Sequence, residues 1–122
     1  TLVSSSAASD VYKRQINSYL GMKVTFFNQL HDAALDFSCS PRRIIDSVSA
    51  DKRIGFAHTR VPGFDGKKGF GGACLPKDMN AFVKFNQDLT LIAESVKINN
   101  KMREEYELDE REKNNNIKFE DK

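Results

Sequence analysis

Residues 16–37, INSYLGMKVTFFNQLHDAALDF, carry the pattern that decides the fold. Apolar side chains return every three or four positions, and this spacing places them on one face of an α-helix. They are Ile16, Leu20, Val24, Phe27, Leu30 or His31, and Ala34. Such a helix is roughly 30 Å long. Further apolar residues at Tyr19, Phe26 and Leu35 widen this face, so we expect the helix to contact more than one neighbour.

Shorter helical patterns follow along the chain. Ser40 before Pro41 is typical of a helix cap followed by a first-turn proline, and it predicts a helix over residues 42–50. A second helix is expected over residues 76–85, and a third begins at Asp88 or Thr90. The inward face of the third comprises Leu91, Ile92, Ser95, Val96, Asn99, Met102 and Tyr106. Because no strand pattern or repeat is present, we predict an all-α bundle of about four helices with a long N-terminal helix and a glycine-rich loop.

The chemistry centres on residues 69–78, GFGGACLPKD. Three glycines in four positions permit positive φ and let the backbone approach a ligand closely. Pro76 fits the first turn of a helix, which places Cys74 just before the helix start. Free amides, the positive end of the helix dipole and Lys77 favour a thiolate there. Cys74 is therefore a candidate nucleophile, and Asp78 is a candidate base.

The same residues also have a structural interpretation. Glycine-rich turns commonly precede helices, and free cysteines usually behave as buried hydrophobic residues. Asp78 could serve only to cap its own helix. The spacing of these residues leaves both interpretations open.

The composition excludes several classes of protein. The 122 residues, 39% hydrophobic and 30% charged, suffice for one compact domain. A net charge of +2, from 19 basic and 17 acidic residues, indicates no strong field for nucleic acid or anionic membrane. No apolar run is long enough to span a bilayer. Two isolated cysteines, Cys39 and Cys74, indicate a reduced, cytoplasmic setting, and the cysteines and histidines lack the close pairs of a zinc site, so we expect no metal.

Four stretches resemble one known family in the same order along the chain. They are GFGGACLPKD (69–78), NSYLGMKVTFFN (17–28), DKRIG (51–55) and DLTLIAESVKINN (88–100). The first is similar to the long and specific catalytic-cysteine signature of the UDP-glucose and GDP-mannose dehydrogenase family. The resemblance covers residues 16–103 and implies that family's central helical domain, with a fold like the C-terminal domain of 6-phosphogluconate dehydrogenase.

The resemblance implies a role for each residue of the catalytic set. These enzymes oxidise a sugar 6-hydroxyl to a carboxylate in two NAD-dependent steps. Cys74 would add to the intermediate aldehyde as a thiohemiacetal and then carry a thioester. Lys13 and Asn17 would stabilise the developing oxyanion, and Asp78 would orient or activate water. Lys77 would contact the cofactor phosphates.

A second set of residues matches the family's substrate contacts. Arg53 corresponds to an arginine that reaches the nucleotide sugar, in dimers from the neighbouring subunit. Arg60 matches a basic substrate contact only loosely, because the loop carries extra residues. Phe70 belongs to the segment that covers the sugar nucleotide, and Gly71 and Gly72 would leave room for the sugar.

The chain divides into three parts on this interpretation. Residues 1–15, TLVSSSAASDVYKRQ, resemble translated adaptor sequence, and we expect a non-native or disordered leader. Lys13 falls inside it, so its role depends on this stretch being native. Residues 16–103 form the central helical (dimerisation) domain. Residues 104–122 are expected to be a charged tail or linker that frays.

The expected partners follow from a cofactor-binding motif that this sequence lacks. A glycine-rich fingerprint for NAD is absent, and in the family it lies on a preceding Rossmann domain, with a following domain for UDP. The resemblance therefore implies a fragment that acts on a UDP-sugar such as UDP-glucose, forms a homodimer through the long helix and is inactive alone; GDP-mannose remains open. The alternative is a non-catalytic helical association module with a structural Cys74, and the long helix could also be buried within its own subunit.

Overall fold

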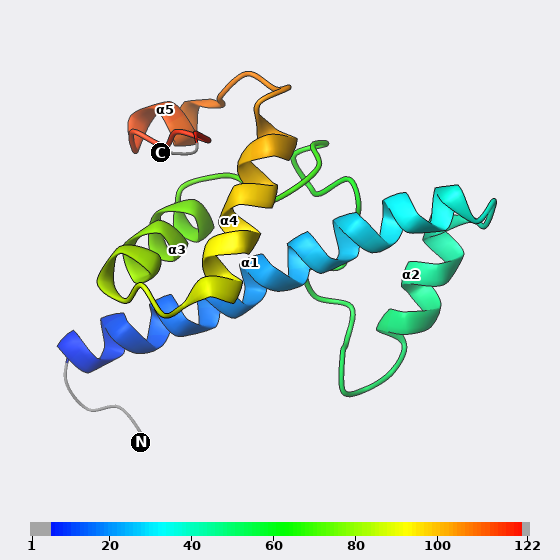
Figure 1. Ribbon diagram of the computed structural model, residues 1–122, viewed down its shortest axis with the longest axis horizontal. Coiled ribbons are helices and arrows are strands. Elements are labelled where there is room, and N and C mark those ends of the chain that lie inside the picture. Colours follow the sequence, from blue (N-terminus) through cyan, green and yellow to red (C-terminus); the bar gives the residue numbers. More distant parts are fainter. Residues whose placement is uncertain (1–5, 121–122) are drawn as a thin grey trace.

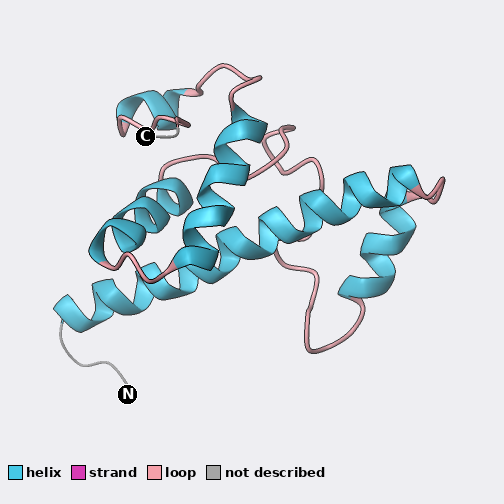
Figure 2. Ribbon diagram, viewed as in Figure 1, coloured by secondary structure: helices cyan, strands magenta, loops and turns pink. Residues whose placement is uncertain are grey.

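The computed structural model describes residues 6–120, and within this range the only regular elements are helices, with no strand (Figures 1 and 2). The all-α prediction is confirmed. The helices within these residues are α1 (Ser6–Asp36), α2 (Pro41–Ser49), α3 (Cys74–Phe85), α4 (Thr90–Arg103) and α5 (Glu110–Asn114). A long loop, residues 50–73, joins α2 to α3, as the glycine and proline pairs of this stretch predict.

Helix α1 crosses the whole molecule, and α2, α3 and α4 each pack against it (Figure 1). Helices α3 and α4 pack against its first half and against each other, and α2 folds back against its C-terminal end. Ser40 caps α2 by accepting a hydrogen bond from the Arg43 amide at 3.4 Å, and Pro41 is the first helical residue. This start agrees with the sequence pattern.

Helix α1 is longer than its apolar pattern predicts. It begins at Ser6 rather than Ile16, so residues 6–15, expected to be irregular, continue the helix, and residues 10–15 are exposed. The apolar pattern misses these turns because they cover no core and need no apolar face. The prediction for residues 1–5 lies outside the described residues, and the non-native origin of residues 1–15 stays a prediction.

The segment after α4 is folded, where the sequence predicts fraying. Asp109 and Glu112 form a capping box that starts α5, and each side chain accepts a hydrogen bond from the other's backbone amide at 2.9 Å. Glu112 and Ile117 are buried. The segment is highly charged, so its composition predicts a solvated tail and does not reveal that two of its residues point inward.

Helices α1 and α3 pack closely at Gly21, in the middle of α1. Met79 of α3 is fully buried against it, and a methyl group at position 21 would overlap the Met79 sulfur. Met79 forms the core with Phe70 and Val96, and the partly buried Met22, Val24, Leu75 and Ile92 pack around them. Gly21 therefore sets the distance between α1 and the helix that carries Cys74.

We predict that Gly21→Ala destabilises the chain. Alanine normally favours a helix over glycine, but here the added methyl would have to displace a buried side chain, at a cost of about 1–3 kcal/mol. Urea unfolding followed by circular dichroism measures the change. Gly63→Ala is the control, because its Cβ would meet only the Asp65 side chain at 3.4 Å and Lys67 backbone at 3.6 Å. A stabilised Gly21→Ala variant would show that the contact with Met79 is not tight.

Within residues 6–120, no helix is both long and apolar enough to cross a membrane.

Candidate functional site

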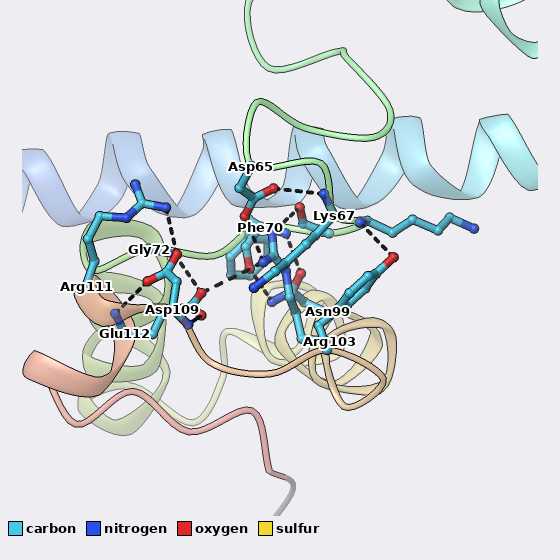
Figure 3. A network of polar contacts seen from close by, with 12 residues as sticks. Asp65, Lys67, Phe70, Gly72, Asn99, Arg103, Asp109, Arg111 and Glu112 are labelled. Carbon is cyan, nitrogen blue, oxygen red and sulfur yellow. Dashed lines mark hydrogen bonds and ion pairs between the residues drawn. The ribbon is translucent and has the colours of Figure 1, made fainter.

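The backbone of the glycine turn, residues 69–72, is held by side chains from other elements. Asn28 of α1 accepts a hydrogen bond from the Gly69 amide at 3.1 Å. Asn99 of α4 accepts from the Phe70 amide at 2.6 Å and donates to the Phe70 carbonyl at 2.9 Å (Figure 3). Because Asn99 satisfies both polar groups of one residue, it fixes the position and the orientation of the turn.

Two buried charged residues also hydrogen-bond to the backbone of the glycine turn. Arg103, 2% exposed, donates to the Gly69 carbonyl and to Asp65 Oδ2, both at 2.9 Å. Glu112, 1% exposed, accepts from the Gly72 amide at 2.9 Å, and its Oε2 lies 3.8 Å from Arg103 Nη1. Figure 3 shows Arg103 arriving from α4 and Glu112 from α5. The turn is therefore fastened by two helices that follow it in the sequence.

The glycines of the turn have no Cβ and so leave room for the side chains that hold it. Gly69 has a φ of +76°, and a Cβ there would overlap the Asn99 amide oxygen. A Cβ at Gly71 would overlap Glu112 and Arg103. The family resemblance predicts that Gly71 leaves room for the sugar. In the structure, the side chains of Glu112 and Arg103 occupy the space where a Cβ at Gly71 would lie.

The holding residues were not singled out from the sequence, although some signal was present. Asn99 occupies an inward position in the apolar series of α4, and Arg103 lies one helical turn later on the same face. A polar side chain on an inward face implies a buried partner. The spacing of Asp109 and Glu112 is that of a capping box, which could have revealed α5.

The candidate nucleophile, base and oxyanion residue lie where α1 meets α3. Helix α3 begins at Cys74 itself, so Cys74 is the first helical residue rather than the residue before the helix. Its side chain is exposed. Asp78, one turn later, accepts a hydrogen bond from Asn17 Nδ2 at 2.6 Å. The structure thus joins Asn17 to Asp78 and places Asp78 on the same side of α3 as Cys74.

Three other predicted residues stand apart from this group. Lys13 is exposed one turn before Asn17 on α1, and Lys77 is exposed in the first turn of α3. Arg53 is also exposed, and its guanidinium donates to both oxygens of Asp51, at 3.0 and 2.7 Å. These hydrogen bonds lower the pKa of Asp51. The neighbouring backbone is tied to α1 by Lys23, which donates to the Ile54 carbonyl at 2.7 Å.

The remaining predicted substrate residues meet at a hollow of about 280 Å³ between the long loop and the glycine turn. Its lining includes Arg60, Phe70 and Gly71, while Gly72 is buried beside it. The Arg60 guanidinium lies 5.1 Å from the centre of the Phe64 ring, which also lines the hollow. The hollow reaches Leu75 and does not include Cys74.

A larger hollow, of about 520 Å³, lies between the end of α4 and residues 118–120 and contains none of the predicted site residues. We assign no role to it. Among the residues that the structure describes, no group of three or more His, Cys, Asp or Glu side chains is arranged to hold a metal ion.

We predict that Asn99→Ala destabilises the chain and loosens the glycine turn. The substitution leaves the buried Phe70 amide and carbonyl unpaired, which costs about 1–3 kcal/mol for each group. Urea unfolding measures the loss, and hydrogen exchange at the Phe70 amide should accelerate. Asn114→Ala, at an exposed position at the end of α5, is the control. Unchanged exchange at Phe70 in Asn99→Ala would contradict the proposed hold.

Comparison with known proteins adds the following. Residues 7–103 match the UDP-glucose/GDP-mannose dehydrogenase family, central domain. The chain is 32% identical over 97 residues to a UDP-glucose 6-dehydrogenase of Rhizobium meliloti (strain 1021), a match that covers 75% of this chain and 21% of that protein. It is 44% identical over 62 residues to a UDP-glucose 6-dehydrogenase of Campylobacter jejuni, covering 51% and 14%.

A relative with a different named substrate is also similar. A GDP-mannose 6-dehydrogenase of Pseudomonas savastanoi is 34% identical over 76 residues, covering 62% of this chain and 16% of that protein. The chain thus spans about a fifth or less of the length of these relatives. No solved structure shows a significant match to it.

Proposed function

Because this chain belongs to the UDP-glucose/GDP-mannose dehydrogenase family, we propose that it is a central-domain piece of an NAD-dependent UDP-glucose 6-dehydrogenase. The observation that carries this proposal is the Asn17–Asp78 hydrogen bond beside the helix start that presents Cys74. A cysteine that only fills the core would be buried, whereas Cys74 is exposed one helical turn before Asp78. The whole enzyme would turn over only with the nucleotide-binding domains that lie outside this chain.

The position of Cys74 supports a role in covalent catalysis. Its sulfur is exposed at the N-terminal end of α3, where the unpaired amides of the first turn and the helix dipole favour a negative charge. A thiolate there would attack the aldehyde carbon and form the carbon–sulfur bond of a thiohemiacetal. After oxidation to the thioester, hydrolysis would release the uronate and return the thiol.

In this reaction, Asn17 would stabilise the oxyanion and Asp78 would orient the water. The Asn17 amide has two N–H groups, and only one of them is needed for the bond to Asp78. The second can donate to the oxyanion of the thiohemiacetal. Asp78 retains a carboxylate oxygen to orient the water that hydrolyses the thioester. Lys13, one turn from Asn17 and exposed, would add a positive charge to the oxyanion.

On this proposal, the cofactor would contact the chain through Lys77. NAD, when bound, supplies the hydride acceptor for both oxidations. Lys77 is exposed in the first turn of α3, so its ammonium is available to a phosphate of the dinucleotide. Substrate would be contacted by Arg60, Phe70 and Gly71 at the hollow, with Gly72 beside it, and by Arg53 from the second subunit of a dimer.

Selective alkylation of Cys74 tests the catalytic proposal on the chain itself. Both cysteines are exposed, so accessibility does not distinguish them. Cys39 lies in the turn between α1 and α2, where its thiol donates to the Phe37 carbonyl at 3.5 Å, while Cys74 starts α3. We expect iodoacetamide near neutral pH to modify Cys74 faster than Cys39 by about three- to tenfold.

The variants Cys39→Ser and Cys74→Ser assign each rate, and the reaction is followed by mass spectrometry. In a longer protein that contains this chain with its nucleotide-binding domains, Cys74→Ser should abolish UDP-glucose-dependent NADH formation, and Cys39→Ser should leave it unchanged. Equal alkylation rates would favour the alternative, a helical association module with a structural cysteine.

An exposed apolar stripe on α1 supports the second part of the proposal, a homodimer. The stripe comprises Tyr12, Ile16, Tyr19 and Phe26, which are 42–60% exposed. Their spacings of four, three and seven residues place them on one side of the helix. A second copy of α1 would bury this side. The same stripe is what favours the association module, so the dimer alone does not separate the two functions.

We predict that Tyr19→Glu disrupts the dimer, because it places a charge in the middle of the stripe. Sedimentation velocity should show a concentration-dependent dimer for the unmodified chain and a monomer for the variant. Phe85→Glu is the control, since Phe85 is exposed at the end of α3. A monomeric unmodified chain, or equal dissociation in both variants, would refute the interface.

A further inference from the structure

The hollow beside the glycine turn has an excess of positive charge. Arg60, Arg103 and Arg111 line it, with Asp65 as the acidic residue among the lining side chains. Arg103 and Asp65 form an ion pair at 2.9 Å and offset each other. Arg60 and Arg111 remain among the lining residues, and Arg111 is paired with Asp109, which does not line the hollow. The other walls include the rings of Phe56, Phe64 and Phe70. This combination suits a ligand that carries anionic oxygens.

Arg111 belongs to a part of the chain outside the family match, which ends at residue 103. Its position is nevertheless fixed by the contacts of the residues around it. The next residue, Glu112, is buried and holds the Gly72 amide, and the capping box with Asp109 fixes the same helical turn. Arg111 is therefore carried by a segment that is fastened directly to the glycine turn.

The Arg111 guanidinium lies over the turn (Figure 3). A Cβ at Gly72 would be 3.3 Å from Arg111 Nη1, so this nitrogen is adjacent to the backbone two residues before Cys74. Arg111 Nη2 donates to Asp109 Oδ2 at 2.9 Å, which orients the guanidinium plane. The side chain is 63% exposed. A ligand in the hollow would meet Nη1 without displacing the bond to Asp109.

We propose that Arg111 is a ligand-binding residue that pairs with an anionic oxygen group held at this hollow. The inference rests on the proposed function, which supplies two sources for such a group: the diphosphate of a nucleotide sugar and the carboxylate of the uronate product. The planar fork of arginine pairs with phosphate and carboxylate oxygens alike. The segment after residue 103 then contributes to substrate selection as well as to the fold.

The test uses the 122-residue chain and follows the Gly71 and Gly72 amide resonances by NMR during titration. The probes are uridine diphosphate, glucuronate and uncharged glucose. We expect one of the two anions to shift these resonances, and Arg111→Gln to raise its dissociation constant about three- to tenfold. A response to uridine diphosphate identifies the diphosphate as the partner, and a response to glucuronate identifies the carboxylate.

Two further variants make the result specific to Arg111. Arg111→Lys keeps the charge and loses the fork, so it should recover only part of the affinity. Arg42→Gln removes a 92% exposed arginine of α2 that does not line the hollow, and it should change nothing. An equal dissociation constant in Arg111→Gln, or no shift of the glycine resonances with either anion, overturns the inference.

This failure is distinguishable from failure of the proposed function. The selectivity of alkylation for Cys74 over Cys39 depends on α3, not on Arg111. Selective alkylation combined with anion binding that ignores Arg111→Gln would remove the role of Arg111 and leave the catalytic proposal intact. Loss of affinity in Arg111→Gln without selective alkylation would instead support the binding role and remove the catalytic one.

Discussion

The pairing between the Asn99 side chain and the backbone of Phe70 is the constraint on which the rest of this structure depends. One amide group satisfies both the N–H and the C=O of Phe70, as a neighbouring strand would. Phe70 is buried in the core with Met79 and Val96, so water cannot replace Asn99 as the hydrogen-bond partner of its backbone. The turn that precedes Cys74 therefore takes its position from α4.

The helices could be predicted largely from the sequence, because their signals are local. Apolar spacing located the long helix, and Ser40 with Pro41 located the start of α2. The beginning of α1 could not be predicted, since none of residues 6–15 belongs to the core and their few apolar side chains do not set a period. Helix α5 was missed because its charges dominate the composition, although its capping box is visible in the sequence.

The candidate site could be predicted only in part, for a physical reason. Cys74 and Asp78 lie in one helix, so their spacing shows that they share a side. The contacts of the glycine turn with Asn28, Asn99 and Glu112 join residues that are 41, 29 and 40 positions apart. No periodicity reports such contacts, because they depend on how the helices pack rather than on any one helix.

The buried charges of the turn contribute to its geometry more than to the free energy of unfolding. Removing Arg103 and Glu112 from water costs several kcal/mol for each ion, which their hydrogen bonds and the ion pair with Asp65 must offset. Arg103 Nε has no hydrogen-bond partner among the described residues, so the offset is incomplete. An apolar core of equal volume would stabilise the fold at least as well, but it could not bond the Gly69 carbonyl and the Gly72 amide. These bonds leave the turn one arrangement, and that arrangement sets where α3 begins and where the Cys74 sulfur lies.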